Sequence, residues 1–190
     1  MPQSEARRAF GHVDANYRFI AAYQEVNARI AQRQQSLALY VTLVVSLLAS
    51  LVALRPDRGQ ATLPVEWLVQ GFGLAAACLA LLNHKSERAI TNLRRFLSQL
   101  EQVQDVHLSL PSYNTDPRWA AEANRARRFH DHACAVLAAG GSAVGLATAW
   151  SLYPQRFAAQ AWPLWLAATV SVASVVGIVL SARWHYEPGV

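Results

Sequence analysis

The stretch that decides the fold is SLALYVTLVVSLLASLVAL, residues 36–54, in which no side chain is charged. It belongs to a window of 21 uncharged residues between Arg33 and Arg55. A helix that crosses a bilayer needs about 20 mostly apolar residues, because each residue adds about 1.5 Å along the helix axis. The stretch contains neither proline nor glycine, so it is predicted to form one uninterrupted transmembrane helix.

Three further windows of uncharged residues follow along the chain, with lengths of 18, 24 and 26 residues. Of the 190 residues, 53% are hydrophobic and 15% are charged. Soluble domains average about a quarter charged residues, so a soluble enzyme, a disulfide scaffold and a disordered chain are all disfavoured. We expect one all-α membrane domain over residues 1–190, with four transmembrane helices at about 36–54, 64–83, 132–152 and 163–182.

The basic residues are distributed unevenly about these four spans. With spans that alternate in direction, 14 Lys and Arg residues lie on the side of both termini and 3 on the other side. Cytoplasmic segments carry the excess of Lys and Arg, so both termini and residues 84–131 are predicted to be cytoplasmic. This asymmetry explains the net charge of +5. Acidic residues are interspersed and no nucleic-acid-binding motif is present, so we expect no nucleic acid as a direct partner.

Three polar segments beside the spans have the periodicity of amphipathic helices. In the second of them Leu93, Phe96 and Leu100 recur at steps of three and four, the spacing of a coiled-coil seam. Apolar faces on three neighbouring helices are predicted to pack into a cytoplasmic stalk that continues the membrane bundle. One short stalk cannot bury all these faces, so we expect a closed homo-oligomer of four or more subunits. The three segments are residues 13–35, 84–106 and 117–131.

Polar side chains mark one face of each of the first two spans. Thr42, Ser46 and Ser50 follow at steps of four on the first span. Glu66 and Gln70 share one face of the second. Polar atoms in hydrocarbon need partners or water, so these residues are candidates to line a pore. Hydrogen bonding inside a closed bundle is the alternative for the hydroxyls, and solvation at the outer interface is the alternative for Glu66.

Small residues gather on the last two spans. Gly141 and Gly145 form a small-xxx-small pair on the third, and Ser174 and Gly177 lie on the fourth. Small side chains allow helix backbones to approach closely in lipid. These residues are therefore predicted to make helix contacts, either within one chain or between subunits.

No sequence motif of catalysis is present: there is no phosphate-binding glycine loop, no G-x-S-x-G, no H-E-x-x-H and no CxxC pair. His130 and His132 point about 200° apart on a helix, an arrangement that does not favour binding of one metal ion. Arg127 and Arg128 beside them are expected to contact anionic lipid or an acidic partner. We therefore expect no enzymatic activity, no metal and no cofactor.

An amphipathic helix that runs into a membrane span, here Tyr17 to Leu54 with Asn27 and Arg33, precedes a second span and a basic helical segment. This architecture resembles the SLATT-type and four-span membrane effectors of bacterial anti-phage systems. The resemblance covers most of the chain, implies a multi-pass protein of the bacterial inner membrane, and carries no functional residue across. SLATT-type effectors typically have two spans, and this chain departs from them by a second hairpin.

Two functions from different classes follow. The first is an oligomeric effector that opens a pore or perturbs the bilayer when its stalk receives a signal. The second is a non-conducting scaffold that docks a cytosolic partner protein on the stalk. Membrane lipids and further copies of the chain are the expected partners, with a cytosolic defence protein as a further candidate.

Overall fold

The computed structural model describes residues 15–55, 64–102, 113–183 and 186. Every regular element in these ranges is a helix, and four of the helices are long and apolar enough to cross a membrane. The predicted all-α membrane class is therefore confirmed. The helices are α2 (Ala15–Ala53), α3 (Val65–Glu101), α5 (Pro117–Leu152), α6 (Pro154–Ala159) and α7 (Trp162–Ser181).

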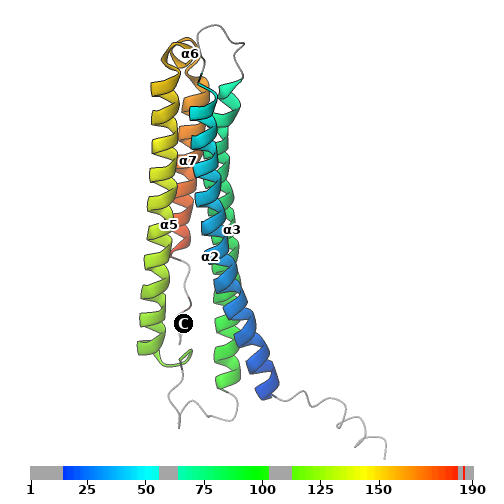
Figure 1. Ribbon diagram of the computed structural model, residues 1–190. Coiled ribbons are helices and arrows are strands. Elements are labelled where there is room, and N and C mark those ends of the chain that lie inside the picture. The colour runs from blue at the N-terminus through cyan, green and yellow to red at the C-terminus, as the bar shows by residue number, and fades with distance from the viewer. Residues whose placement is uncertain (1–14, 56–63, 103–112, 184–185, 187–190) are drawn as a thin grey trace, which may run out of the picture.

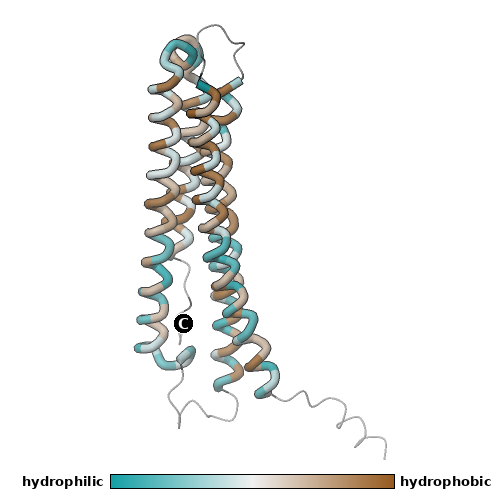
Figure 2. Tube along the Cα trace, viewed as in Figure 1, coloured by the Kyte–Doolittle hydropathy of each residue, from teal (hydrophilic) through white to brown (hydrophobic). Residues whose placement is uncertain are grey.

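The four long helices lie side by side in one elongated bundle (Figure 1). Figure 2 shows that apolar residues dominate one half of this bundle and polar residues the other. The apolar half contains all four long helices, whereas α7 ends at Ser181, where the polar half begins. The polar half consists of the N-terminal part of α2, the C-terminal part of α3 and the N-terminal part of α5. Each of these three helices is continuous through both halves.

Local sequence explains where several helices begin. The side chain of Asp116 caps α5 by accepting a hydrogen bond of 2.9 Å from the Arg118 backbone N–H, and Pro117 occupies the first turn. Proline also lies in the first turns of α6 and α7. Proline suits these positions because its missing N–H would have no helical partner there.

The apolar half has a closely packed core. Leu51, Phe72, Ala138, Phe157 and Ile178, from five different helices, are each completely buried. Many large apolar side chains also point outward, as expected for helices whose outer faces meet lipid rather than water. The most exposed of these on the outer faces include Leu39, Val45, Trp67, Leu74, Leu81, Val136, Trp165 and Val172.

The short helix α6 was not predicted, because the sequence after Tyr153 reads as a turn that ends a span. In the structure α6 closes the end of the bundle farthest from the polar half (Figure 1). Phe157 is completely buried beneath it, and the Tyr153 hydroxyl donates a hydrogen bond of 2.8 Å to the Leu51 carbonyl. A helix of six residues anchored by one buried ring is too short to leave a periodic signal in the sequence.

The buried face of α3 in the polar half differs from the predicted seam by one position. Ile90, Arg94 and Leu97 are buried, whereas Leu93 and Leu100 are half-buried and Phe96 is 41% exposed. The face rotates inward at Arg94 because this arginine finds polar partners on α5 and on the turn before α5. A pattern search for apolar residues alone therefore selects the flank of the interface instead of its centre.

Candidate functional site

Five polar and charged residues meet inside the bundle where its apolar and polar halves join. We call Arg33, Asn83, Glu87, Arg127 and Asp131 the junction cluster. Four of them are almost completely buried, and the Arg127 side chain is 15% exposed. They come from α2, α3 and α5, and the Asn83 side-chain amide also lies 3.4 Å from the hydroxyl of Ser181 on α7. All four long helices are therefore linked at this level.

Ion pairs and hydrogen bonds connect the junction cluster. Arg33 pairs with both Glu87 and Asp131, and Arg127 pairs with Glu87. Arg33 Nε donates to Asn83 Oδ1 at 3.0 Å, and Asn83 Nδ2 donates to Asp131 Oδ1 at 2.9 Å. The two guanidinium groups balance the two carboxylates. This balance matters because an isolated buried charge is strongly destabilising, whereas a fully paired one is tolerated.

A cleft opens in the polar half, directly beside the junction cluster. Its volume is about 770 Å³, within the usual range for a small-molecule site. One wall is apolar and comes mainly from α2, with Phe19, Tyr23, Val26 and Ile30 at successive turns. The facing walls come from α3 and α5. The cleft therefore lies among the three helices that continue into the membrane spans.

Cationic side chains line the part of the cleft formed by α3 and α5. Arg94 is 5% exposed, and its Nη1 donates a hydrogen bond of 2.8 Å to Asn124 Oδ1. Its Nη2 is buried and has no hydrogen-bond partner among the described residues, and the same is true of Nε and Nη1 of Arg127 and Nε2 of His130. In the described ranges, no carboxylate comes within ion-pair distance of Arg94.

Burial and neighbouring positive charge shift two pKa values at this wall. Burial lowers the pKa of Arg94, and the charge of Arg127 lowers it further. Burial also lowers the pKa of His130 below 6.5, and the charge of Arg33 acts in the same direction. Guanidinium groups remain protonated in proteins, so Arg94 and Arg127 form a positively charged site while His130 is mainly neutral at pH 7.

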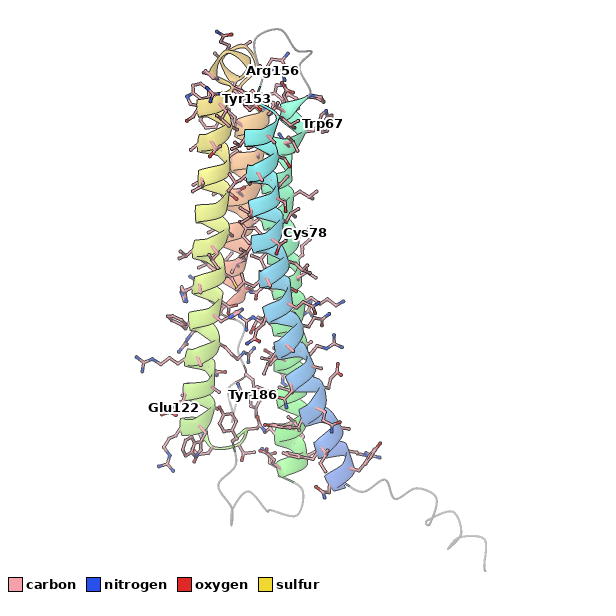
Figure 3. The ribbon with its side chains drawn as sticks, viewed as in Figure 1. Trp67, Cys78, Glu122, Tyr153, Arg156 and Tyr186 are labelled. Carbon is pink, nitrogen blue, oxygen red and sulfur yellow. The ribbon has the colours of Figure 1, made fainter. Side chains whose placement is uncertain are left out.

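Tyr186 connects the walls of the polar half behind Arg94. Figure 3 shows this residue between α5 and α3. Its hydroxyl donates a hydrogen bond of 2.6 Å to Ser98 Oγ, and its carbonyl accepts one of 2.8 Å from Asn124 Nδ2. Its ring lies 5.8 Å from the Arg94 guanidinium carbon, a cation–π distance. The chain after α7 thus returns into the polar half and joins α3 to α5.

The predicted pore-lining stripe of α2 faces away from the bundle core. Thr42 and Ser46 are exposed, and Ser50 is half-buried. Each hydroxyl donates to the carbonyl four residues earlier on its own helix, at distances of 2.8 to 3.0 Å. The stripe is therefore available to lipid, to a second copy of the chain or to water in an oligomeric pore, and its hydroxyls are satisfied in each case.

Glu66 and Gln70 lie at the end of the bundle opposite the polar half. Glu66 pairs with Arg156 at 3.4 Å, and Gln70 Nε2 donates to the Pro163 carbonyl at 2.7 Å. Figure 3 shows Arg156, Tyr153 and Trp67 at this end of the bundle. Both candidate residues therefore tie α3 to the α6–α7 region of the same chain.

The small residues of the last two spans have different surroundings. A Cβ atom at Gly141 would lie 2.7 Å from the Tyr40 hydroxyl, and one at Gly145 would lie 2.5 Å from Phe72 Cδ1. These two glycines therefore pack within the chain, against α2 and α3. Ser174 is buried and donates to its own helix, whereas a Cβ atom at Gly177 would meet open space.

The two arginines expected to contact lipid or a partner are placed differently. Arg127 points into the bundle and pairs with Glu87, so its main contact is intramolecular. Arg128 is exposed. The neighbouring His132 is also exposed, with Nδ1 at 2.6 Å from the Arg128 carbonyl. Within the described ranges, no three metal-binding side chains come together.

Apart from Arg127, neither the residues of the junction cluster nor Arg94 were predicted as site residues from the sequence. Arg33, Glu87 and Asp131 each lie close to the end of an uncharged window, which was the available signal. Residues at such ends usually face water or lipid headgroups, so their inward orientation was not anticipated. No protein-family model, curated protein or solved structure matches the chain, so its function is argued from this geometry.

Proposed function

We propose that the protein is an oligomeric inner-membrane effector of bacterial anti-phage defence, which opens a pore or perturbs the bilayer when its polar half receives a signal. The observation that carries this proposal is that Arg33 and Arg127 both line the cleft and belong to the junction cluster. A ligand in the cleft would therefore contact the same guanidinium groups that hold the membrane helices together.

The chemistry of these arginines supports coupling between cleft and spans. An anion near Arg127 competes with Glu87 for the guanidinium group, and Glu87 also pairs with Arg33 on α2. Weakening these ion pairs would change the packing of α2 against α3 and α5. A ligand shifts a conformational equilibrium only by its differential affinity for the two states, and the junction cluster offers a physical source of that difference.

The orientation rests on charge. The Lys and Arg excess lies on the polar half, which under the positive-inside rule is the cytoplasmic side. In this orientation the cleft opens to the cytoplasm and both termini are cytoplasmic. The bacterial inner membrane and the defence role rest on the architectural resemblance to small membrane effectors.

The pore requires more than one subunit. The interior of a single bundle is filled by side chains such as Leu51 and Phe72, which are completely buried. The outward stripe with Thr42 and Ser46 gives α2 a hydrophilic face that several copies could direct toward a common axis. The 18-residue apolar window of α2 is also only 17% buried, the lowest share of the four membrane-length helices.

Reconstitution tests the proposal directly. The purified protein is placed in K⁺-loaded liposomes for flux measurements and in nanodiscs for mass determination. We expect a multimer of at least four subunits and K⁺ release that depends on protein. A monomer without flux would reject the effector function.

Orientation is tested separately with single cysteines at two exposed positions, Asn92 on α3 and Gln160 after α6. The background carries Cys78→Ala and Cys134→Ala, because these are the two native cysteines. An impermeant thiol reagent added to intact cells should label the cysteine at Gln160 and spare the one at Asn92. The reverse pattern would place the polar half outside.

A scaffold that docks a cytosolic protein is the second candidate. It is favoured by aromatic side chains that are exposed on the polar half, namely Tyr17 at 69%, Trp119 at 47% and Phe129 at 77%. Exposed aromatic residues commonly anchor protein interfaces. A multimer or monomer that binds a cytosolic protein through these residues, and that never conducts, would support the scaffold.

A further inference from the structure

We infer that the cleft binds a small organic anion, in which a phosphate or carboxylate group is attached to an apolar or aromatic body. The anionic group would lie between Arg94 and Arg127, and the body against the α2 wall. This inference deepens the proposed function by naming the ligand chemistry. The binding itself can be measured whether or not the protein conducts ions.

The anionic group is indicated by unused buried donors. Nη2 of Arg94 and both Nε and Nη1 of Arg127 are buried, and no residue in the described part of the chain forms a hydrogen bond with them. A buried donor without a partner is costly, and it is costlier when it carries charge. Guanidinium groups present parallel N–H donors that match the oxygens of phosphate and carboxylate. An anion held by these atoms would satisfy donors for which the described residues supply no acceptor.

The charge balance at this wall also favours an anion. Arg33 and Arg127 share the carboxylates of Glu87 and Asp131, which the junction cluster already uses. Arg94 is held by the neutral side chains of Asn114 and Asn124. Glu101 also lines the cleft, where it accepts a hydrogen bond of 2.7 Å from Asn114. Among the described residues no carboxylate forms an ion pair with Arg94, so within these ranges its positive charge is balanced only by neutral partners.

The apolar body is indicated by the opposite wall. Phe19, Tyr23, Val26 and Ile30 present aromatic and branched side chains to the cleft. Ile30 and Tyr23 are 43% and 55% exposed, although they lie on the inner side of the polar half. Inorganic phosphate alone would leave this wall in water. Burying this wall under an apolar body would be favourable, because it removes apolar surface from water.

The position of the cleft favours a soluble ligand over a bilayer lipid. Arg94 follows the predicted end of the second span, Asn83, by 11 residues, which corresponds to about 16 Å along a helix. A phospholipid that remains in its leaflet would keep its phosphate near the end of the span. A soluble amphiphile can instead reach Arg94 through the open side of the cleft.

Binding is tested with 1-naphthyl phosphate as the probe, because it carries a phosphate on an aromatic body. The full protein is placed in nanodiscs of zwitterionic lipid and titrated by calorimetry, with empty nanodiscs as the blank. We expect saturable binding of 1-naphthyl phosphate. Inorganic phosphate and 1-naphthol, which each provide half of the ligand chemistry, should bind at least tenfold more weakly.

Two arginines on the same helix provide matched variants. Arg94→Gln should weaken the binding of 1-naphthyl phosphate at least tenfold, because it removes the buried charge. Arg95→Gln, which removes the same charge from an exposed position, should change the affinity less than twofold. Should Arg94→Gln fail to fold, Ile30→Trp fills the cleft from the α2 side without altering charge, and it should weaken binding by a similar factor.

The possible results separate this inference from the proposed function. No saturable binding, or equal losses in Arg94→Gln and Arg95→Gln, would overturn the site. Competition by phosphatidylglycerol added to the nanodiscs would support the site and assign its anion to lipid. Saturable binding by a protein that never conducts would overturn the effector function and retain the site. Flux without saturable binding would overturn the site and retain the effector function.

Discussion

At the scale of single residues, contact between helices in the apolar half depends on glycine. A Cβ atom at Gly145 would lie 2.5 Å from Cδ1 of the completely buried Phe72 ring. Gly145→Ala should therefore destabilise the bundle by about 1–3 kcal/mol, the usual cost of overpacking a core. Thermal unfolding in detergent measures this effect. Phe72→Leu in the same chain should restore part of the loss.

Gly140 is the control for this prediction, because a Cβ atom there would meet nothing within 4 Å. Gly140→Ala should leave the unfolding temperature unchanged or raise it, since alanine favours the helix over glycine. Equal melting of the two alanine variants would show that α5 does not approach Phe72 as closely as the structure indicates.

The junction cluster makes a second prediction at this scale. Among the described residues, Arg33→Gln leaves Asp131 without an ion-pair partner and Glu87 with Arg127 alone, so it should cost about 3–5 kcal/mol of unfolding free energy. Adding Asp131→Asn should recover part of this loss by restoring the charge balance. Arg29→Gln on the same helix removes an ion pair with Glu25 and an exposed hydrogen bond to Gln32, both near the surface, and should have little effect. Similar melting of Arg33→Gln and Arg29→Gln would contradict a buried network.

His130 gives the stability of the polar half a pH dependence. Burial and the charge of Arg33 lower its pKa in the folded state, against a weaker opposing effect of Glu87. Protonation therefore favours the unfolded chain, so this contribution to stability is present above about pH 6.5 and is lost as the pH falls through the lowered pKa. His130→Gln should make the unfolding temperature depend less on pH between pH 5 and pH 7. The substitution His132→Gln, at an exposed position, should not have this effect. The same dependence of unfolding temperature on pH in both variants would contradict a contribution from His130.

At the scale of elements, α3 shows which parts of the fold a sequence can predict. Its membrane portion was recognised because lipid requires an unbroken run of uncharged residues. The rotation of its polar portion was predicted one position away from the observed face. The burial of Arg94 determines that rotation. This burial depends on hydrogen bonds to Asn114 and Asn124, which lie 20 and 30 residues after Arg94 in the sequence. An apolar periodicity contains no information about such partners.

The candidate site was less predictable than the spans for the same reason. Arg33 bonds to Asn83 and Asp131, at separations of 50 and 98 residues. These contacts form only when the four helices pack against the correct neighbours, each with the correct rotation about its own axis. Tyr186 contacts Asn124 from beyond α7, and the sequence between Ser181 and Tyr186 contains no turn motif that would predict this contact. Charges at the ends of the spans were visible in the sequence, but their inward orientation was not.

The exposed flank of α3 makes a prediction about assembly. Phe96 is 41% exposed and belongs to the predicted seam, so it is free to contact another subunit. Phe96→Arg should reduce the mass of the oligomer in nanodiscs. It should leave the unfolding temperature unchanged, because the Phe96 side chain is not part of the buried face of α3. Trp119→Arg, at an exposed aromatic position of α5 outside the seam, is the control and should leave the mass unchanged. An unchanged mass for Phe96→Arg would exclude the seam as the assembly element.

At the scale of the whole molecule, the bundle has a packed interior and a polar outer stripe on α2. In many water-soluble proteins polar exteriors need no explanation, but the outer face of a membrane span meets hydrocarbon. The hydroxyls of Thr42, Ser46 and Ser50 are bonded to their own helix, so lipid exposure would cost little. The same stripe can therefore face lipid, another subunit or a pore, and these three environments differ in how they accept a larger apolar side chain.

Ser46→Leu separates these three environments. Ser46 is exposed in the single chain, so the larger side chain causes no clash within its own bundle. In a pore formed by several α2 helices, the added apolar bulk would narrow and dewet the path, so K⁺ flux from liposomes should fall at least tenfold while the oligomer mass stays the same. Thr169→Leu makes a comparable change at an exposed hydroxyl of α7, also bonded to its own helix, and should leave flux unchanged. Loss of the oligomer in Ser46→Leu would instead place the stripe in a subunit contact, because a packed site cannot accept leucine. Unchanged flux and mass would place it against lipid and remove α2 from the pore.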